Sequence, residues 1–164
     1  MLRGHFEGVA VIDLFAGVGT MGLEAISQGA ASVLMVEQDR RIFNLLERNV
    51  QELDCADRAD LLCGDALGAM ALLRAPRPVH VCFVDPPFAM MEDEALRQRI
   101  LDQVQEAGQL LDPSGFVVLR TPLDPDRVLH SVPGLDGPEV HAHGKNHFVC
   151  LYALPPEEAD DGCA

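Results

Sequence analysis

The chain has 164 residues, of which 48% are hydrophobic and 23% are charged, so it fits one globular domain and not a disordered, collagenous or coiled-coil protein. No apolar run approaches the length of a membrane span, and the first residues lack the apolar core of a signal peptide, so we expect no membrane association. Twelve basic residues against 26 acidic ones give a net charge of −14, and because such a field repels polyanions, it argues against a general nucleic-acid binder.

Strand patterns alternate with helix patterns through most of the chain. Short apolar runs, typical of strands buried on both faces, occupy residues 9–14, 32–37, 60–63, 79–84 and 116–119. A helix is predicted from the glycine-rich segment 16–22 to about Gln28, and apolar residues at helical spacing predict two more, over 40–53 and from about Leu96 to Leu111. The last helix is expected to end at a turn over residues 112–115.

The C-terminal part of the chain has a different pattern. Residues 139–143 and 147–154 are extended runs joined by Gly144-Lys145-Asn146, which predicts a hairpin. Residues 155–164 are acidic and lack apolar periodicity, so we expect a disordered tail after one domain over residues 1–154. The predicted fold class is α/β, with a doubly wound sheet that is mostly parallel and has an antiparallel C-terminal edge hairpin. Ligands bind such sheets beyond the carboxyl ends of the strands.

A glycine pattern, G-x-G-x-x-G, follows the first predicted strand at Gly17, Gly19 and Gly22. Without side chains the backbone can turn sharply and approach a ligand closely, although a tight strand-to-helix turn alone also favours glycine. Glu37 lies 20 residues after Gly17, at the end of the second predicted strand, where a carboxylate can accept hydrogen bonds from ribose hydroxyls. These residues alone leave a nicotinamide cofactor open.

Two further carboxylates narrow the choice of cofactor. Asp13 lies inside the first predicted strand, and Asp65 follows the third, where its side chain can reach an adenine amino group. Three carboxylates around one ligand would repel a pyrophosphate. S-adenosylmethionine fits better, because it carries hydroxyls, an ammonium group and a sulfonium but no phosphate. Each acid alone also suits a helix cap or a solvated turn, and Asp39 is expected to be the N-cap of the second helix.

The segment Asp85-Pro86-Pro87-Phe88 ends the fourth predicted strand and is the most specific feature of the chain. Two prolines fix the backbone and remove two N–H donors, which sets the directions of the nearby carbonyls and of the carboxylate. Two such acceptors can hold the hydrogens of an exocyclic base amine and free its lone pair for attack on a methyl group. Phe88 offers a face on which an extruded base can stack. The alternative is a rigid turn with a buried phenylalanine.

Neither the histidines nor the cysteines predict a metal site. His141 and His143 alternate along an extended run, and a turn separates them from His147. The five cysteines contain no C-x-x-C pair, so we expect neither structural zinc nor a disulfide framework, and a reducing cytoplasm fits best. A patch that faces phosphates would have to come from basic residues after the proline turn, which we expect near the mouth of the site: Arg97, Arg99, Arg120, Arg127 and Lys145.

Four segments together resemble the RsmD-like family of 16S rRNA guanine-N2 methyltransferases. They are residues 11–25 (VIDLFAGVGTMGLEA), 36–37 (VE), 64–66 (GDA) and 85–88 (DPPF), and the resemblance covers roughly residues 8–154. It implies a seven-stranded, Rossmann-like methyltransferase sheet with S-adenosylmethionine along the first three strand ends. By this resemblance the cofactor would be bound by Asp13, Phe15, Gly17, Gly19, Glu37, Asp65 and Ala66. The target guanine would be held by Asp85, Pro86 and Phe88.

The expected activity is therefore methyl transfer to guanine N2, with ribosomal RNA or the small ribosomal subunit as the partner. In one respect the chain departs from the family, whose members typically carry a basic N-terminal segment before the first strand, because here eight residues precede Val9. Two other functions fit the same residues. One is adenine-N6 methylation of DNA or RNA, and the other is a non-catalytic S-adenosylmethionine-binding module that lacks its RNA-binding arm.

Overall fold

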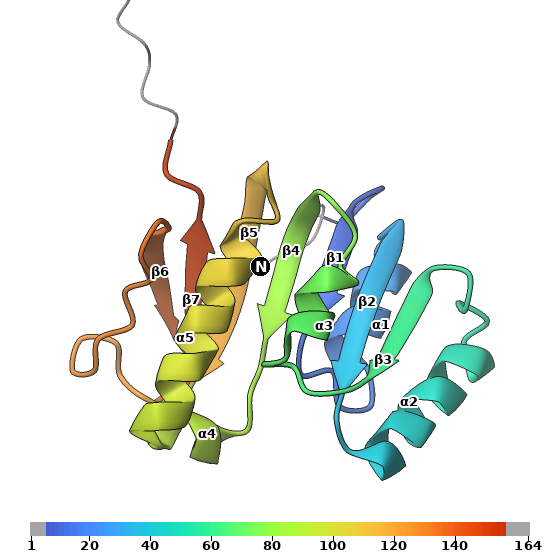
Figure 1. Cartoon of the computed structure of the whole chain (residues 1–164), viewed down its shortest axis with the longest axis horizontal. Helices are drawn as coiled ribbons and strands as arrows, with labels where there is room; N and C mark the ends of the chain where they lie inside the picture. Colours follow the sequence, from blue (N-terminus) through green and yellow to red (C-terminus); the bar gives the residue numbers. More distant parts are fainter. Residues whose placement is uncertain (1–5, 157–164) are drawn as a thin grey trace, which may run out of the picture.

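The computed structural model describes residues 6–156, and its centre is one seven-stranded sheet (Figure 1). The strand order is β3-β2-β1-β4-β5-β7-β6. Neighbouring strands from β3 to β5 are parallel, whereas β7 runs antiparallel to both β5 and β6. The strands are β1 (Ala10–Asp13), β2 (Ser32–Glu37), β3 (Ala59–Cys63), β4 (Val79–Val84), β5 (Leu111–Thr121), β6 (Asp136–Ala142) and β7 (Phe148–Ala153). This confirms the predicted fold class, a mostly parallel α/β sheet that ends in an antiparallel hairpin.

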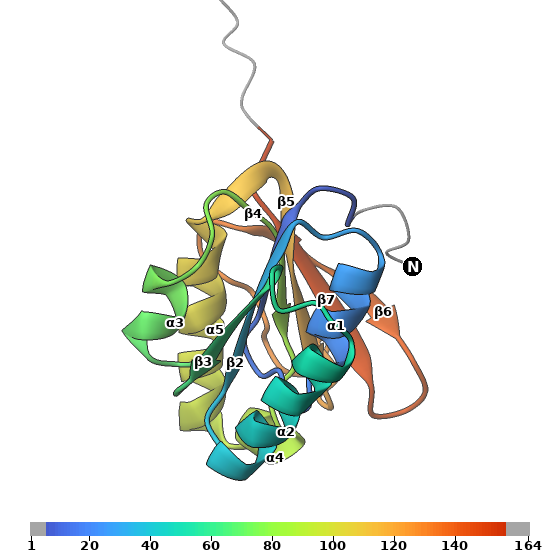
Figure 2. The same ribbon diagram turned by 90° about the vertical axis from the view of Figure 1, so that its right-hand side faces the viewer.

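Helices cover both faces of the sheet, with α1 and α2 on one side and α3 and α5 on the other (Figure 2). The helices are α1 (Thr20–Ser27), α2 (Arg40–Glu52), α3 (Ala69–Leu73), α4 (Phe88–Glu92) and α5 (Glu94–Gly108). Successive strand residues point to opposite faces. Val11 therefore joins the apolar cluster under α1 and α2, whereas Ile12 joins the one under α3 and α5. The apolar strands expected from the sequence are apolar because both faces are covered.

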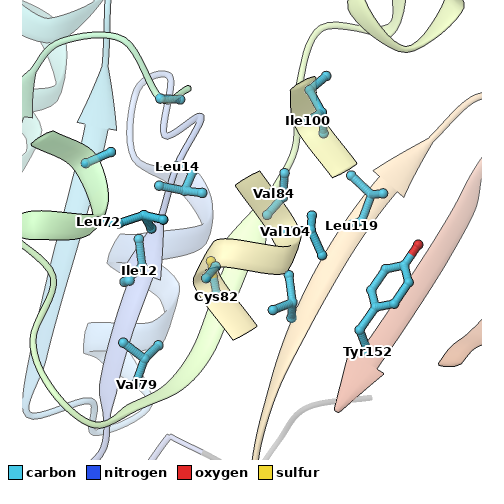
Figure 3. Close-up of a cluster of buried hydrophobic side chains, with 14 of the residues drawn as sticks. Ile12, Leu14, Leu72, Val79, Cys82, Val84, Ile100, Val104, Leu119 and Tyr152 are labelled. Carbon is cyan, nitrogen blue, oxygen red and sulfur yellow. The ribbon is translucent and has the colours of Figure 1, made fainter. Parts of the chain in front are cut away.

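The cluster beneath α3 and α5 connects the centre of the sheet with its antiparallel end (Figure 3). Ile12 and Val84 come from the central strands, Ile100 from α5 and Tyr152 from β7, and all four are fully buried. The Tyr152 hydroxyl donates a hydrogen bond to the backbone carbonyl of His130 at 2.8 Å. This core fixes β4 and β5 side by side, so the residues that follow each strand have defined positions.

Three features differ from the sequence-based expectations. The short helices α3 and α4 were not expected, because five residues give too little periodicity to detect. Strand β5 starts at Leu111 and not near Phe116, so the expected turn over residues 112–115 lies within it. There the register with β4 shifts between Val79 and Val81, and a Cβ on Gly115 would lie 2.7 Å from the Val79 carbonyl oxygen. The irregular pairing accommodates a segment whose residue types favour a turn.

Residues 154–156 follow β7 without regular structure, and the remainder of the expected disordered tail lies outside the described residues. Among the described helices, none is both long and apolar enough to cross a membrane.

The close packing of α1 on β2 predicts a stability effect at Gly22. A Cβ there would lie 2.5 Å from Sδ of the fully buried Met35, so Gly22→Ala should lower the free energy of unfolding by about 1–3 kcal/mol in urea titrations. Gly64→Ala is the matched control, because its Cβ would meet nothing closer than 3.6 Å, and its effect should stay within about 1 kcal/mol. Equal effects of the two substitutions would contradict this packing argument.

Candidate functional site

A cavity of about 370 Å³ opens at the carboxyl ends of the central parallel strands. It is lined by Leu14, Phe15, Gly17, Val36, Glu37, Gln38, Ala66, Asp85, Pro86, Pro87, Phe88 and Arg120. Seven residues expected at the site therefore share one cavity: Phe15, Gly17, Glu37, Ala66, Asp85, Pro86 and Phe88. Asp13, Gly19 and Asp65 are not part of its lining. The residues expected to bind the cofactor (the cofactor half) and those expected to bind the base (the base half) thus form adjoining walls of the same cavity.

The Glu37 carboxylate holds the glycine loop against the end of β2. Its Oε2 atom accepts a hydrogen bond from the Gly17 N–H at 3.0 Å, and Oε1 accepts one from the Asp39 N–H at 2.7 Å. Each carboxylate oxygen has a second lone pair, so Glu37 can still accept hydrogen bonds from a ligand hydroxyl. The Asp39 side chain accepts hydrogen bonds from the Arg41 and Ile42 amides, so it caps α2 as expected.

Gly17 and Gly19 have different roles in the loop. Gly17 has φ +57 and nothing near the position of a Cβ, so it presents bare backbone to the cavity. Gly19 has φ +94, and a Cβ there would lie 2.6 Å from Cδ1 of Leu46 and 2.9 Å from Cδ1 of Leu23. Position 19 therefore requires glycine, both for the turn into α1 and for the close packing on α2.

Asp13 lies behind the glycine loop and is 1% exposed. Its Oδ2 atom accepts a hydrogen bond from the Gly22 N–H in α1 at 3.0 Å, whereas its buried Oδ1 atom has no hydrogen-bond partner among the described residues. Burial raises the pKa of Asp13 to about 7, and the nearby charges of Asp85 and Glu37 add to the rise. Side chains along β1 alternate between the two faces of the sheet, so Asp13 shares a face with Val11, which packs under α1. The sequence could therefore have predicted this buried position.

The loop after β3 is fixed by α5. The Gln103 side-chain amide, which is almost fully buried, donates a hydrogen bond to the Ala66 carbonyl at 2.7 Å. Asp65 is exposed, accepts a hydrogen bond from the Leu67 N–H at 2.9 Å, and lies 3.8 Å from the Arg99 guanidinium. Ala66 therefore lines the cavity, and Asp65 lies beside it.

The proline turn leads directly into α4, whose first residue is Phe88. The Arg120 guanidinium, from β5, donates a hydrogen bond to Oδ2 of Asp85 at 2.6 Å, and its Cζ atom lies 5.9 Å from the centroid of the Phe88 ring. His147 meets the same ring edge-on, with centroids 5.2 Å apart. Burial raises the pKa of Asp85, and the charge and hydrogen bond of Arg120 oppose that rise. Sequence reasoning missed both contacts of Phe88, because they depend on strands distant in the chain.

The basic residues that were expected to gather near the mouth are spread over four places. Arg120 lines the cavity, Arg99 faces Asp65, and Arg97 donates a hydrogen bond to the Met91 carbonyl at 2.9 Å. Arg127 and Lys145 line a second hollow of about 490 Å³. Within residues 6–156, no three His, Cys, Asp or Glu side chains gather in a way that would suit a metal ion.

Residues 1–151 match the model of the family described as Conserved hypothetical protein 95. The chain belongs to this family. YlbH of Bacillus subtilis is 29% identical over 119 residues, which are 72% of this chain and 62% of that protein. Ribosomal RNA small subunit methyltransferase D of Escherichia coli is 33% identical over 101 residues, 62% of this chain and 48% of that protein. These matches confirm the RsmD-like resemblance, and they span less than two thirds of either relative's length.

Solved structures show the same fold. The Escherichia coli protein yhhF aligns with a TM-score of 0.74 and 25% identity, over 93% of this chain and 79% of that one. TrmN from Thermus thermophilus aligns with a TM-score of 0.75 and 26% identity, over 94% of this chain and 47% of that one.

The buried Asp13 predicts a pH dependence of stability. An unfolded aspartate has a pKa near 3.8, whereas folded Asp13 has one of about 7, so the folded protein binds this proton more tightly. The contribution of Asp13 to the free energy of unfolding is therefore greatest below about pH 4 and declines as the pH rises towards 7. Asp13→Asn cannot titrate, so its stability relative to wild type should improve across that window in urea titrations. Asp126→Asn, an exposed position outside the cavity lining, is the control, and a parallel Asp13→Asn profile would contradict the assignment.

Proposed function

We propose that the protein transfers a methyl group from S-adenosylmethionine to an exocyclic base amine, guanine N2 of 16S ribosomal RNA. The observation that carries the proposal is one cavity shared by the glycine loop, Glu37 and Ala66 on one side and the Asp85–Phe88 turn on the other. Curated relatives from Escherichia coli and Haemophilus influenzae are named ribosomal RNA small subunit methyltransferase D, which supports methylation of small-subunit ribosomal RNA. The domain proposed to carry it is residues 1–154, acting in the cytoplasm.

The acidic character of the cavity supports S-adenosylmethionine over a phosphate-bearing cofactor. The charges of Glu37 and Asp85 raise the pKa of Asp13, so the three carboxyl groups interact electrostatically. A ligand that brings a cation into this region lowers the repulsion, and one that brings a phosphate increases it. In the proposed binding mode Glu37 accepts hydrogen bonds from the ribose hydroxyls, Gly17 lies against the ligand, and Asp65 with Ala66 flanks the adenine. The unpartnered Oδ1 atom of Asp13 adds to the negative potential behind the loop.

The chemistry of the base half follows from Asp85 and the proline turn. Bound S-adenosylmethionine supplies an electrophilic methyl group on a cationic sulfur. Asp85 accepts one amine hydrogen at Oδ1, the oxygen that has no hydrogen bond to Arg120, and a carbonyl of the proline turn accepts the other. These contacts would hold the amine lone pair towards the methyl group. As the nitrogen–carbon bond forms, the methyl–sulfur bond breaks and its electron pair stays on the sulfur, which leaves as the neutral thioether of S-adenosylhomocysteine. The surplus proton of the amine passes to Asp85 or to water. Phe88 stacks on the extruded base, so catalysis rests on positioning and electrostatics.

The proposed partner, ribosomal RNA or the small ribosomal subunit, has to bind a chain of net charge −14. Arg127 and Lys145 line the second hollow together with Pro122 and Asn146, which lie close in the chain to Arg120 and His147 of the base half. In the proposed complex, the phosphates next to an extruded nucleotide lie near Arg127 and Lys145.

The direct test is transfer of labelled methyl from S-adenosylmethionine to unmodified 16S RNA and to assembled small subunits. Transfer to guanine N2 is the expected result. Transfer to adenine N6 of DNA or RNA would favour the related enzyme activity. Cofactor binding in calorimetry without transfer to any nucleic acid would favour a binding module.

Glu37→Ala should weaken S-adenosylmethionine binding by about tenfold to a hundredfold, because a charge-assisted hydrogen bond to a ligand hydroxyl is lost. Calorimetry measures the affinity, and thermal unfolding checks that the variant is folded. Glu47→Ala removes an exposed carboxylate of α2 and should leave the affinity unchanged. Unchanged affinity in folded Glu37→Ala would remove this residue from the cofactor site.

Asp85→Ala should abolish methyl transfer while it keeps the affinity for S-adenosylmethionine within a few-fold, because Asp85 is assigned to the amine and not to the cofactor. Phe88→Ala should raise KM for RNA and lower kcat together, since stacking aids both extrusion and alignment. Wild-type transfer rates in Asp85→Ala would refute the assigned role.

A further inference from the structure

Arg120 reaches the predicted base site from a neighbouring strand. Strands β4 and β5 are parallel with Val84 opposite Leu119, so Asp85 and Arg120 are the next residues along the two strands. Oδ2 of Asp85 accepts a hydrogen bond from Nη1 of Arg120 at 2.6 Å. About 26% of the Asp85 side chain and 40% of the Arg120 side chain are exposed, so solvent screens the pair only in part.

We propose that Arg120 is a positioning residue for methyl transfer, which orients the Asp85 carboxylate, keeps it ionised and leaves its Oδ1 atom to the substrate amine. The proposal rests on the proposed function, because the amine is the group that Asp85 would hold. With Oδ2 bound to a guanidinium, rotation of the carboxylate is restricted, and Oδ1 is the oxygen left for the substrate amine. Charge-assisted hydrogen bonds of this kind are short and directional.

The surroundings of Asp85 make such a partner necessary. Asp13 from β1 interacts with it as a like charge, and Glu37 from β2 lines the same cavity. His147, just before β7, contacts Phe88. Burial raises the pKa of Asp85, and the Arg120 guanidinium is the group that lowers it. A protonated Asp85 would offer a hydroxyl donor and a weaker acceptor, so it could not hold the amine hydrogens in the same way.

Arg120 also restrains the aromatic ring on which the base would stack. Its Cζ atom lies 5.9 Å from the Phe88 centroid, and His147 meets the same ring edge-on. The guanidinium therefore connects the two groups assigned to the base, the acceptor Asp85 and the platform Phe88. One side chain from β5 thereby sets the geometry between a turn after β4 and the first residue of α4.

The experiment compares the wild type with Arg120→Met and Arg120→Lys, with Arg74→Met as the matched control. Arg74 is an exposed arginine whose ion-pair partner is Asp60, and it lines neither of the two cavities described above. The readouts are the pH profile of kcat for RNA methylation and the titration of the Asp85 carboxyl by ¹³C NMR without substrate. Affinity for S-adenosylmethionine is measured in parallel.

Arg120→Met should lower kcat at neutral pH by about tenfold to a hundredfold, the loss expected for a hydrogen bond to a charged group. The acidic limb of the kcat profile and the Asp85 titration should both move to higher pH, because a buried carboxylate without its cation is harder to ionise. Arg120→Lys should restore part of both effects, and Arg74→Met should show neither. Affinity for S-adenosylmethionine should stay within a few-fold in all variants.

An Asp85 titration that is unchanged in Arg120→Met would overturn the inference. So would an unchanged kcat profile with only a raised KM for RNA, because that pattern describes a phosphate contact. If the wild type methylates no nucleic acid, the proposed function fails, and the NMR titration still decides whether Arg120 controls the ionisation of Asp85.

Discussion

The parallel pairing of β1 with both β2 and β4 is the constraint on which the site depends. It brings the ends of these strands to one edge of the sheet, and with them the carboxylates of Asp13, Glu37 and Asp85. Like charges this close raise the free energy of the folded state unless each has a compensating partner. The partners come from the local chain for two of them, the Gly22 and Gly17 amides, and from β5 for the third. The glycine loop thus neutralises part of the site in addition to shaping it.

This arrangement reconciles an acidic protein with the nucleic-acid substrate that we propose for it. Acidic side chains gather at the strand ends that would face a cationic cofactor, and there burial raises the pKa of Asp13 to about 7. Cations lie on the β5 and hairpin side of the cavity, with Arg120 in its wall and Arg127 and Lys145 in the next hollow. The two ligands of the proposed reaction carry opposite charges, and the chain meets them with oppositely charged surfaces.

The sequence predicted the sheet and the cavity better than it predicted the contacts inside the cavity. Short continuous apolar runs located the strands, and the rule that ligands bind at carboxyl ends placed Glu37 and Phe88 around one cavity. The contact between Arg120 and Asp85 was beyond local patterns, because it depends on the register of β4 against β5, which the packed core determines. The start of β5 at Leu111 was missed because the local pattern pointed to another structure: Pro113 and Gly115 are typical of turns.

The segment between β4 and β5 carries the coupling between the two halves of the site. It supplies Phe88 at the start of α4 for the base, and it supplies Gln103 from α5, whose buried amide holds the Ala66 carbonyl on the cofactor side. Because Ile100 and Val104 anchor α5 in the core, a shift of this helix would move both walls together. In the proposed reaction, the packing of this one helix on the sheet would therefore set the distance between a bound cofactor and an extruded base. A methyl transfer that relies on positioning needs such rigidity.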